Sequence, residues 1–143
     1  MDYIYPGLFE RDPDGGFLVT FPDVPEAITQ GEDLADARQS AAEALGLALR
    51  GYLAQGRDLP KPSKGRKGHV NIPVEAKDAL KLAVIEAFRA ASITKSEFAR
   101  RIGKAETEAY RVLDPDHATK LASLEAALRA LGKEVIVSVK DAA

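Results

Sequence analysis

The acidic residues near the N-terminus are the first candidates for chemistry in this sequence. Carboxylates arranged around an octahedral ion bind Mg²⁺, and a metal-dependent nuclease would use such a set. These residues, however, lie in turns rich in proline and glycine, where Asp is favoured because its side chain bonds to nearby backbone. Turn formation therefore explains them better than a metal site does. The residues concerned are Asp12, Asp14, Asp23 and Glu26.

The two histidines do not form a recognisable catalytic arrangement. His69 and His117 are far apart in the sequence and lie in loop-like contexts. No nucleophilic residue is separated from either by a spacing that is typical of a catalytic motif. The chain contains no cysteine, which excludes disulfides and thiolate metal sites. We therefore expect no catalytic residues, no bound metal, no cofactor and no enzymatic activity.

The stretch from Thr94 to Leu113 has the pattern of a DNA-binding helix-turn-helix. Apolar residues line one face of a first short helix, Gly103 permits a tight break, and a second apolar face follows. In such a pair the second helix lies in the major groove with its N-terminal side chains near base edges. Any two-helix corner of a helical core would show the same apolar pattern, so this alternative stays open.

The same stretch supplies the candidate DNA contacts. Thr107, Tyr110 and Arg111 are expected to face the groove. The residues expected near phosphates are Lys95, Ser96, Lys104 and Lys120. Glu106 and Glu108 lie on the second helix and oppose this interpretation, because acid repels phosphate even though it can accept a hydrogen bond from cytosine.

Charge divides the chain into two parts. Residues 1–58 carry 11 Asp and Glu against 4 Arg, whereas residues 59–143 carry 16 Lys and Arg against 11 Asp and Glu. The difference predicts an acidic module that attracts a basic protein and a basic module that approaches phosphates, although ordinary surface charge can be divided this way by chance. Without a signal peptide or a long apolar run, we expect a cytoplasmic protein with no membrane partner.

The acidic half predicts three strands and one long helix. Pro6 in the first strand indicates an edge position or a bulge, because proline lacks the N–H that a ladder needs. Asp33 is the expected N-cap of the helix, with Asp36 in a capping-box-like place. Gly46 and Gly51 each cost about 1 kcal/mol against Ala inside a helix, so we expect close packing at both. The strands are expected at 3–10, 17–21 and 27–30, and the helix at 34–55 with a stripe of Leu34, Ala37, Ala41, Leu45, Ala48, Leu49 and Tyr52 buried.

A basic, proline- and glycine-rich linker at about 57–69 follows, either as a solvated loop or as a hinge that also touches DNA phosphates. The strand after it, residues 70–74, is expected to complete the first sheet. The second domain begins with a helix from Glu75, and Thr94 with Glu97 forms a capping box at the start of the next helix. A last strand is expected at 134–140, and its edges need a partner, either residues 70–74 or its copy in another chain.

Residues 3–74 resemble the HicB family of antitoxins. The resemblance implies a partial RNase H-like sheet and helix without RNase H activity. It also implies a role, which is to bind and block HicA, a small ribonuclease toxin that cleaves mRNA. The residues that carry the resemblance are Tyr5-Pro6, the Gly15-Gly16 turn, Phe21-Pro22-Asp23, Thr29 with Gly31, the alanine-rich helix and Pro60-x-Pro62-Ser63.

The second half resembles the Cro/repressor-type helix-turn-helix that many HicB antitoxins carry at the C-terminus. Two positions depart from that pattern: Lys95 stands where Gln is usual, and Ala109 stands where Val or Ile is usual. Neither departure breaks the packing, but Lys95 changes the contact expected with phosphate or base.

The sequence therefore predicts an α+β protein of two domains, residues 1–74 for toxin binding and residues 75–143 for DNA binding and dimerisation. We expect an antitoxin that inhibits a HicA-like toxin, represses its own operon and forms a homodimer or higher homo-oligomer. Asp12, Asp14, Asp23 and Glu26 are the candidate toxin contacts. The alternative is a stand-alone transcriptional regulator whose N-terminal domain binds a small ligand, although no convergent polar set among the apolar positions supports a pocket. A metal-dependent nuclease is a weaker alternative.

Overall fold

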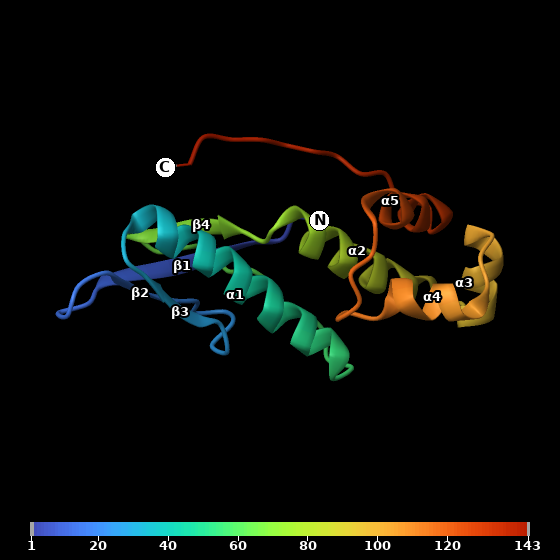
Figure 1. Ribbon diagram of the computed structural model, residues 1–143, viewed down its shortest axis with the longest axis horizontal. Coiled ribbons are helices and arrows are strands. Elements are labelled where there is room, and N and C mark those ends of the chain that lie inside the picture. The colour runs from blue at the N-terminus through green and yellow to red at the C-terminus, as the bar shows by residue number, and fades with distance from the viewer. Residues whose placement is uncertain (1, 143) are drawn as a thin grey trace. The chain divides into compact units, whose positions relative to one another are not determined.

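The computed structural model describes residues 2–142 (Figure 1). Contacts within the chain define two compact units, Met1–Leu82 (unit 1) and Ala83–Ala143 (unit 2). The division falls inside helix α2 (Ala76–Ala91), a few residues beyond the domain boundary that the sequence predicts. Each unit is described by itself.

Unit 1 contains a four-stranded antiparallel sheet. Its strands are β1 (Ile4–Arg11), β2 (Phe17–Thr20), β3 (Ile28–Gly31) and β4 (His69–Pro73), in the order β3-β2-β1-β4. All three pairings are antiparallel. The first three strands lie where the alternating apolar pattern predicts them. The prediction that the segment after the linker completes this sheet is confirmed, because β4 pairs with β1.

Strand β1 has two neighbours that overlap only at Leu8. Its first half pairs with β4 and its second half with β2. Pro6 pairs with Asn71 of β4 and lies outside the β2 pairing. Although β1 is a central strand, Pro6 has a neighbouring strand on one side only. A residue without an N–H is tolerated there, as it is in an edge strand.

Helix α1 (Leu34–Ala54) covers one face of this sheet (Figure 1). Its N-cap is Asp33, whose side chain accepts a hydrogen bond from the Asp36 N–H at 2.8 Å, while the Asp36 carboxylate accepts one from the Glu32 N–H at 2.9 Å. The predicted stripe is buried apart from Leu34, which is exposed, and Ala48, which is half-buried. The core of unit 1 forms from Tyr5, Val19, Phe21, Ala41, Leu45, Leu49 and Ile72.

The two glycines inside α1 have opposite surroundings. A Cβ at Gly46 would collide with the carboxylate of Asp78, which is itself buried and pairs with Arg50 at 3.3 Å. A Cβ at Gly51 would meet nothing within 4 Å. The expected close packing is therefore correct at Gly46 and wrong at Gly51.

Unit 2 is helical, with α3 (Lys95–Ile102), α4 (Glu106–Leu113) and α5 (Leu121–Ala130) following the end of α2. Its core is formed by part of the predicted apolar faces, because Ile102 and Leu113 are only half-buried and Ala105 and Leu121 are exposed. The ring of Phe88 packs edge-on against that of Phe98, with 5.4 Å between centroids. The buried residues of α3, α4 and α5 are Phe98, Ala99, Ala109, Val112, Leu124, Ala127 and Leu128.

The predicted C-terminal strand is wrong for the isolated chain. Residues 133–142 contain no helix or strand, and Ile136, Val137 and Val139 are 89%, 82% and 91% exposed. The intramolecular partner considered for this strand, β4, pairs only with β1 in the sheet. A strand forms only against another strand, and within residues 2–142 no strand pairs with this segment.

Candidate functional sites

Helices α3 and α4 are joined by a tight turn at residues 103–105. Gly103 ends α3 in the left-handed conformation, with φ of 67°. The Lys104 N–H then donates to the Ala99 carbonyl at 3.0 Å, which closes the last turn. Glycine adopts this backbone conformation more readily than other residues, so Gly103 suits the position at which the chain turns toward α4.

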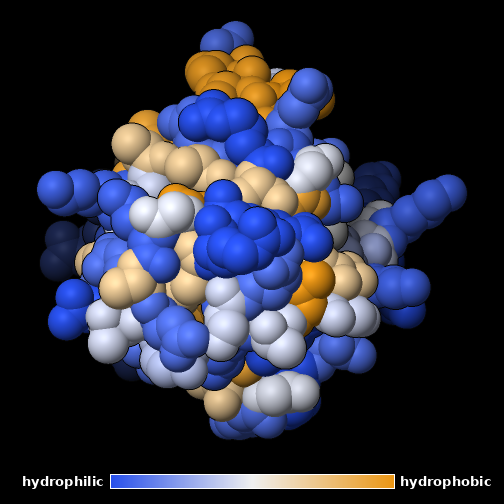
Figure 2. All heavy atoms as spheres, turned by 90° about the vertical axis from the view of Figure 1, so that its right-hand side faces the viewer, coloured by the Kyte–Doolittle hydropathy of each residue, from blue (hydrophilic) through white to orange (hydrophobic). Residues whose placement is uncertain are grey.

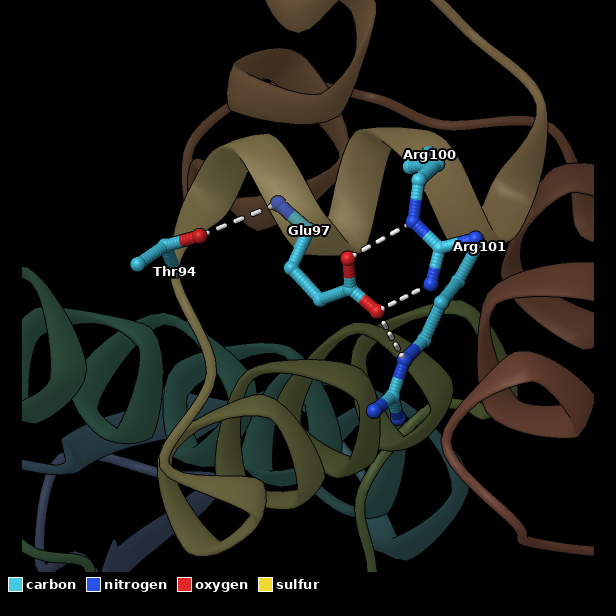
Figure 3. A network of polar contacts seen from close by, with 4 residues as sticks. All are labelled: Thr94, Glu97, Arg100 and Arg101. Atoms are coloured by element: carbon cyan, nitrogen blue, oxygen red, sulfur yellow. Dashed lines mark hydrogen bonds and ion pairs between the residues drawn. The ribbon is translucent and has the colours of Figure 1, made fainter.

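The start of α3 is held by a network of four residues (Figure 3). The Thr94 hydroxyl oxygen accepts from the Glu97 N–H at 3.0 Å, as an N-cap does. The other half of the predicted capping box does not form, because the Glu97 carboxylate instead accepts hydrogen bonds from Arg100 and Arg101. These hydrogen bonds lower the pKa of Glu97 to about 2.

The seven predicted DNA contacts are all exposed in unit 2. The side of unit 2 that carries α3 and α4 faces the viewer in Figure 2 and is covered mostly by hydrophilic side chains. Thr107, Tyr110 and Arg111 share one face of α4, since residues three and four apart in a helix are neighbours. The Lys95 ammonium lies 4.9 Å from the centre of the Tyr110 ring. The start of α3 and the face of α4 therefore form one continuous surface.

The acids that oppose DNA binding are engaged by neighbouring side chains. The Glu106 carboxylate accepts a hydrogen bond from the Ser96 hydroxyl at 2.6 Å. Glu108 lies 3.6 Å from the Arg111 guanidinium. To contact a base, Arg111 would have to give up this ion pair, and this loss reduces the net free energy of binding that the base contact provides.

Most of the positive excess of the second half lies outside unit 2. Residues 70–143 carry 12 Lys and Arg against 11 Asp and Glu, so they are nearly neutral. The excess comes from the linker, where Lys61, Lys64, Arg66 and Lys67 occur without an acid between Leu59 and His69. This linker belongs to unit 1, so the charge division of the sequence does not coincide with the division into units.

Of the four acids proposed from the sequence, Asp12 and Asp23 form hydrogen bonds that stabilise the fold of unit 1. Asp12 accepts from the Asp14 N–H at 2.9 Å, which is the turn chemistry that the sequence predicts. Asp23 accepts from both the N–H and the hydroxyl of Ser63, each at 2.9 Å. The side chains of residues 2–142 form no group of three or more His, Asp or Glu that could hold a metal ion.

Glu26 is tied to helix α1. Its carboxylate accepts a hydrogen bond from the Tyr52 hydroxyl at 2.7 Å. This bond lowers the pKa of Glu26 and raises that of Tyr52. Glu26 is nevertheless exposed, so its charge remains available to a partner.

Two exposed apolar residues were missed by the sequence reasoning. On the face of the sheet opposite α1 (the open face), Leu18 of β2 is 37% exposed and Ile28 of β3 is 61% exposed. Their cross-strand partners, Gln30 and Thr20, lie on the same face, as does Glu10, which pairs with Leu18. Because Phe17, Val19 and Phe21 alternate on one face, Leu18 must lie on the opposite face. This alternation could have predicted an exposed apolar residue at Leu18.

The comparison that decides the family covers unit 1. A family model described as a HicB-like antitoxin of bacterial toxin-antitoxin system matches residues 4–84, more than half of the chain. This chain belongs to the HicB-like antitoxin family. The match spans the sheet and α1 of the antitoxin and ends within α2, so α3, α4 and α5 lie outside it.

Named relatives extend over almost the whole antitoxin. Antitoxin HicB of Escherichia coli (strain K12) is 40% identical over 131 residues, which are 92% of this chain and 95% of that protein. Antitoxin HicB 1 of Photorhabdus laumondii is 32% identical over 136 residues, 95% of this chain and 86% of that protein. In residues 2–142 of this antitoxin, no helix is both long and apolar enough to cross a membrane.

Proposed function

We propose that this HicB-like antitoxin binds and inhibits a HicA-like ribonuclease toxin that cleaves mRNA, and represses its own operon by binding DNA. The observation that carries the proposal is the family match, which covers the acidic unit. The N-terminal domain, residues 1–74, is the proposed toxin-binding part, and the helix-turn-helix of residues 94–113 is the proposed DNA-binding part.

The proposed toxin surface is the open face of the sheet at β2 and β3. Leu18 and Ile28 supply apolar area that a partner would bury, at about 25 cal/mol for each Å² removed from water. Acids surround this area, with Glu10 on the same face and Asp12, Asp14, Asp23 and Glu26 in the turns. A ribonuclease that binds RNA presents a basic surface, so these charges would mainly speed association with it.

Inhibition on this scheme needs no catalytic residue in the antitoxin. An interface of standard size buries about 1,600 Å² in total, which is enough to cover the RNA site of a small toxin. Added salt should then slow association more than it speeds dissociation, because long-range attraction between charges is screened.

The proposed DNA surface is the face of α4 together with the start of α3. On this proposal, Thr107, Tyr110 and Arg111 contact base edges, while Lys95, Ser96, Lys104 and Lys120 contact phosphates. Helix-turn-helix proteins bind two half-sites as dimers. We assign dimerisation to residues 134–140, where exposed Val135, Val137 and Val139 alternate and would pair as a strand with the copy in a second chain.

The toxin proposal is tested by co-expression with the toxin encoded beside the antitoxin. Ile28→Arg should abolish protection of growth, because it places a charge in the proposed interface. Leu47→Arg is the matched control: Leu47 is also 61% exposed but lies on α1. If both variants fold by circular dichroism and both protect cells, the open face is not the toxin surface.

A fragment experiment tests whether the N-terminal domain inhibits the toxin without the C-terminal domain. Residues 1–74 alone should neutralise the toxin. Because Asp78 packs against Gly46 and pairs with Arg50, a second fragment that ends at Leu82 keeps this packing and serves as the more stable companion. If these fragments fold and cells still stop growing, while the full-length protein rescues them, inhibition needs unit 2.

A further inference from the structure

The densest positive charge in the described residues lies in unit 1, on the segment of residues 61–67 (the basic loop). Lys61, Lys64, Arg66 and Lys67 are all exposed. The surface of the remainder of unit 1 is acidic, and unit 2 carries 10 Lys and Arg against 9 Asp and Glu. The basic loop is therefore the main source of positive potential on the chain.

This loop is fixed against the sheet at several points. The Tyr5 hydroxyl donates to the Pro60 carbonyl at 2.6 Å, and Asp23 holds Ser63 by two hydrogen bonds. The backbone at Gly65 lies over the open face, since a Cβ there would be 3.3 Å from the Cβ of Pro6. Pro6 is fully buried although it faces away from α1, which shows that the loop covers it.

A hollow of about 470 Å³ opens beside the loop, lined by Pro22, Ser63, Lys64, Arg66 and His69. The Arg66 backbone N–H donates to Nδ1 of His69 at 3.1 Å. A neutral His69 ring must then carry its proton on Nε2, which is left as a donor. The nearby Asp23 carboxylate is engaged by Ser63. The lining thus presents an ammonium, a guanidinium and an imidazole N–H, the donors that suit a phosphodiester.

We infer that the basic loop binds the phosphate backbone of the DNA that the helix-turn-helix recognises, an inference that rests on the proposed function. Phosphate contacts supply much of the affinity of proteins for DNA, and unit 2 is nearly neutral overall, so it adds little long-range attraction to the contacts proposed for Lys95, Lys104 and Lys120. A basic toxin would be repelled by this loop, which favours DNA as its partner. Because the loop is already fixed, binding costs little conformational entropy.

The test compares two double variants of the full-length protein. Lys64→Gln/Lys67→Gln removes two charges of the loop, and Arg38→Gln/Lys77→Gln removes two charges elsewhere in unit 1. Binding is measured against salt on a duplex from the antitoxin's own promoter and on a random duplex of equal length. Each lost phosphate contact should reduce the slope of log K against log salt by about 0.9, so the loss of both should reduce it by about 1.8 and weaken binding roughly 60-fold at about 0.1 M salt.

The inference predicts this weakening for the loop variant on both duplexes, with the control unchanged and both variants folded by circular dichroism. Equal slopes for wild type, control and loop variant would overturn it. If the loop variant kept its DNA binding and no longer neutralised the toxin, the loop would serve the toxin and the inference would be wrong. Failure of the wild type to prefer promoter DNA would instead reject autorepression, and the random duplex would still report on the loop.

Discussion

The hydroxyl of Ser96 donates a hydrogen bond to the carboxylate of Glu106 over 2.6 Å, across the turn that joins α3 to α4. The bond fixes the orientation of an acidic side chain at the first residue of α4. A carboxylate at a helix N-terminus is favourable for the helix, because it faces the positive end of the helix dipole. It is unfavourable for an approaching phosphate. Glu106 is therefore expected to stabilise α4 and to weaken the DNA binding proposed for this helix.

Replacing Glu106 by Gln should strengthen binding to every DNA sequence. The amide oxygen can still accept from Ser96, while the repulsion between the carboxylate and phosphate disappears. Titrations on promoter and random duplexes measure the change. Glu125→Gln in α5 is the control for net charge. Weaker binding to promoter DNA alone would show that Glu106 instead accepts a hydrogen bond from a base.

Arg111→Ala and Lys104→Ala should affect DNA binding differently. If Arg111 contacts guanine with both nitrogens, its removal should cost about 1–3 kcal/mol on promoter DNA and less on random DNA. Lys104→Ala should weaken all sequences alike and reduce the salt slope by about one unit. An equal effect on both duplexes for Arg111→Ala would mean that this residue only positions the helix.

The two glycines of α1 give a matched pair for stability. Gly46→Ala should destabilise unit 1 by about 1–3 kcal/mol, because the new methyl group displaces the Asp78 carboxylate. Gly51→Ala should stabilise it by up to about 1 kcal/mol, because space is open and alanine favours the helix. Urea denaturation measures both. Similar effects of the two substitutions would contradict the packing described at Gly46.

The Glu97 network predicts how unit 2 responds to acid. Hydrogen bonds from Arg100 and Arg101 hold the pKa of Glu97 at about 2, below its usual 4.5. The stabilisation is therefore complete above about pH 4.5 and is lost as the pH falls toward 2. Thermal denaturation should show that Glu97→Gln loses less stability than wild type over this interval. Glu134→Gln should behave like wild type, and identical profiles for all three would contradict the role given to the network.

Val137→Pro should convert the antitoxin from dimer to monomer. Proline removes a backbone donor in the middle of the segment proposed to pair with a second chain. Sedimentation of the full-length protein at several concentrations measures the association. Ala142→Pro, just beyond residues 134–140, is the control. A dimer of unchanged affinity in Val137→Pro would place the interface elsewhere.

The elements that the sequence predicts correctly are those defined by local chemistry. The Asp33 and Thr94 caps, the Gly103 break and the apolar faces of α3 and α4 depend on residues within a few positions of one another. The strands of unit 1 follow from alternation, and the pairing of β4 with β1 from the need of an apolar strand for a partner. Such features can be predicted without knowledge of the tertiary contacts.

The features that sequence reasoning missed depend on distant residues. The contact of Ser63 with Asp23 and that of Gly65 with Pro6 place the basic loop on the sheet, and no periodicity reveals them. Asp78 explains Gly46 but lies in another helix. The C-terminal segment has the alternation of a strand, yet a strand also requires a paired neighbour, and none pairs with this segment in the part of the chain that the structure describes.

The sharing of β1 between β2 and β4, which overlap at Leu8, predicts an order for folding. Strands β1, β2 and β3 are joined by short connections, so their pairing closes small loops and is expected to be fast. Strand β4 must return across α1 and the linker before it can pair with the first half of β1. During synthesis, when N-terminal segments leave the ribosome first, the acidic open face is therefore expected to form before the basic loop is laid over Pro6.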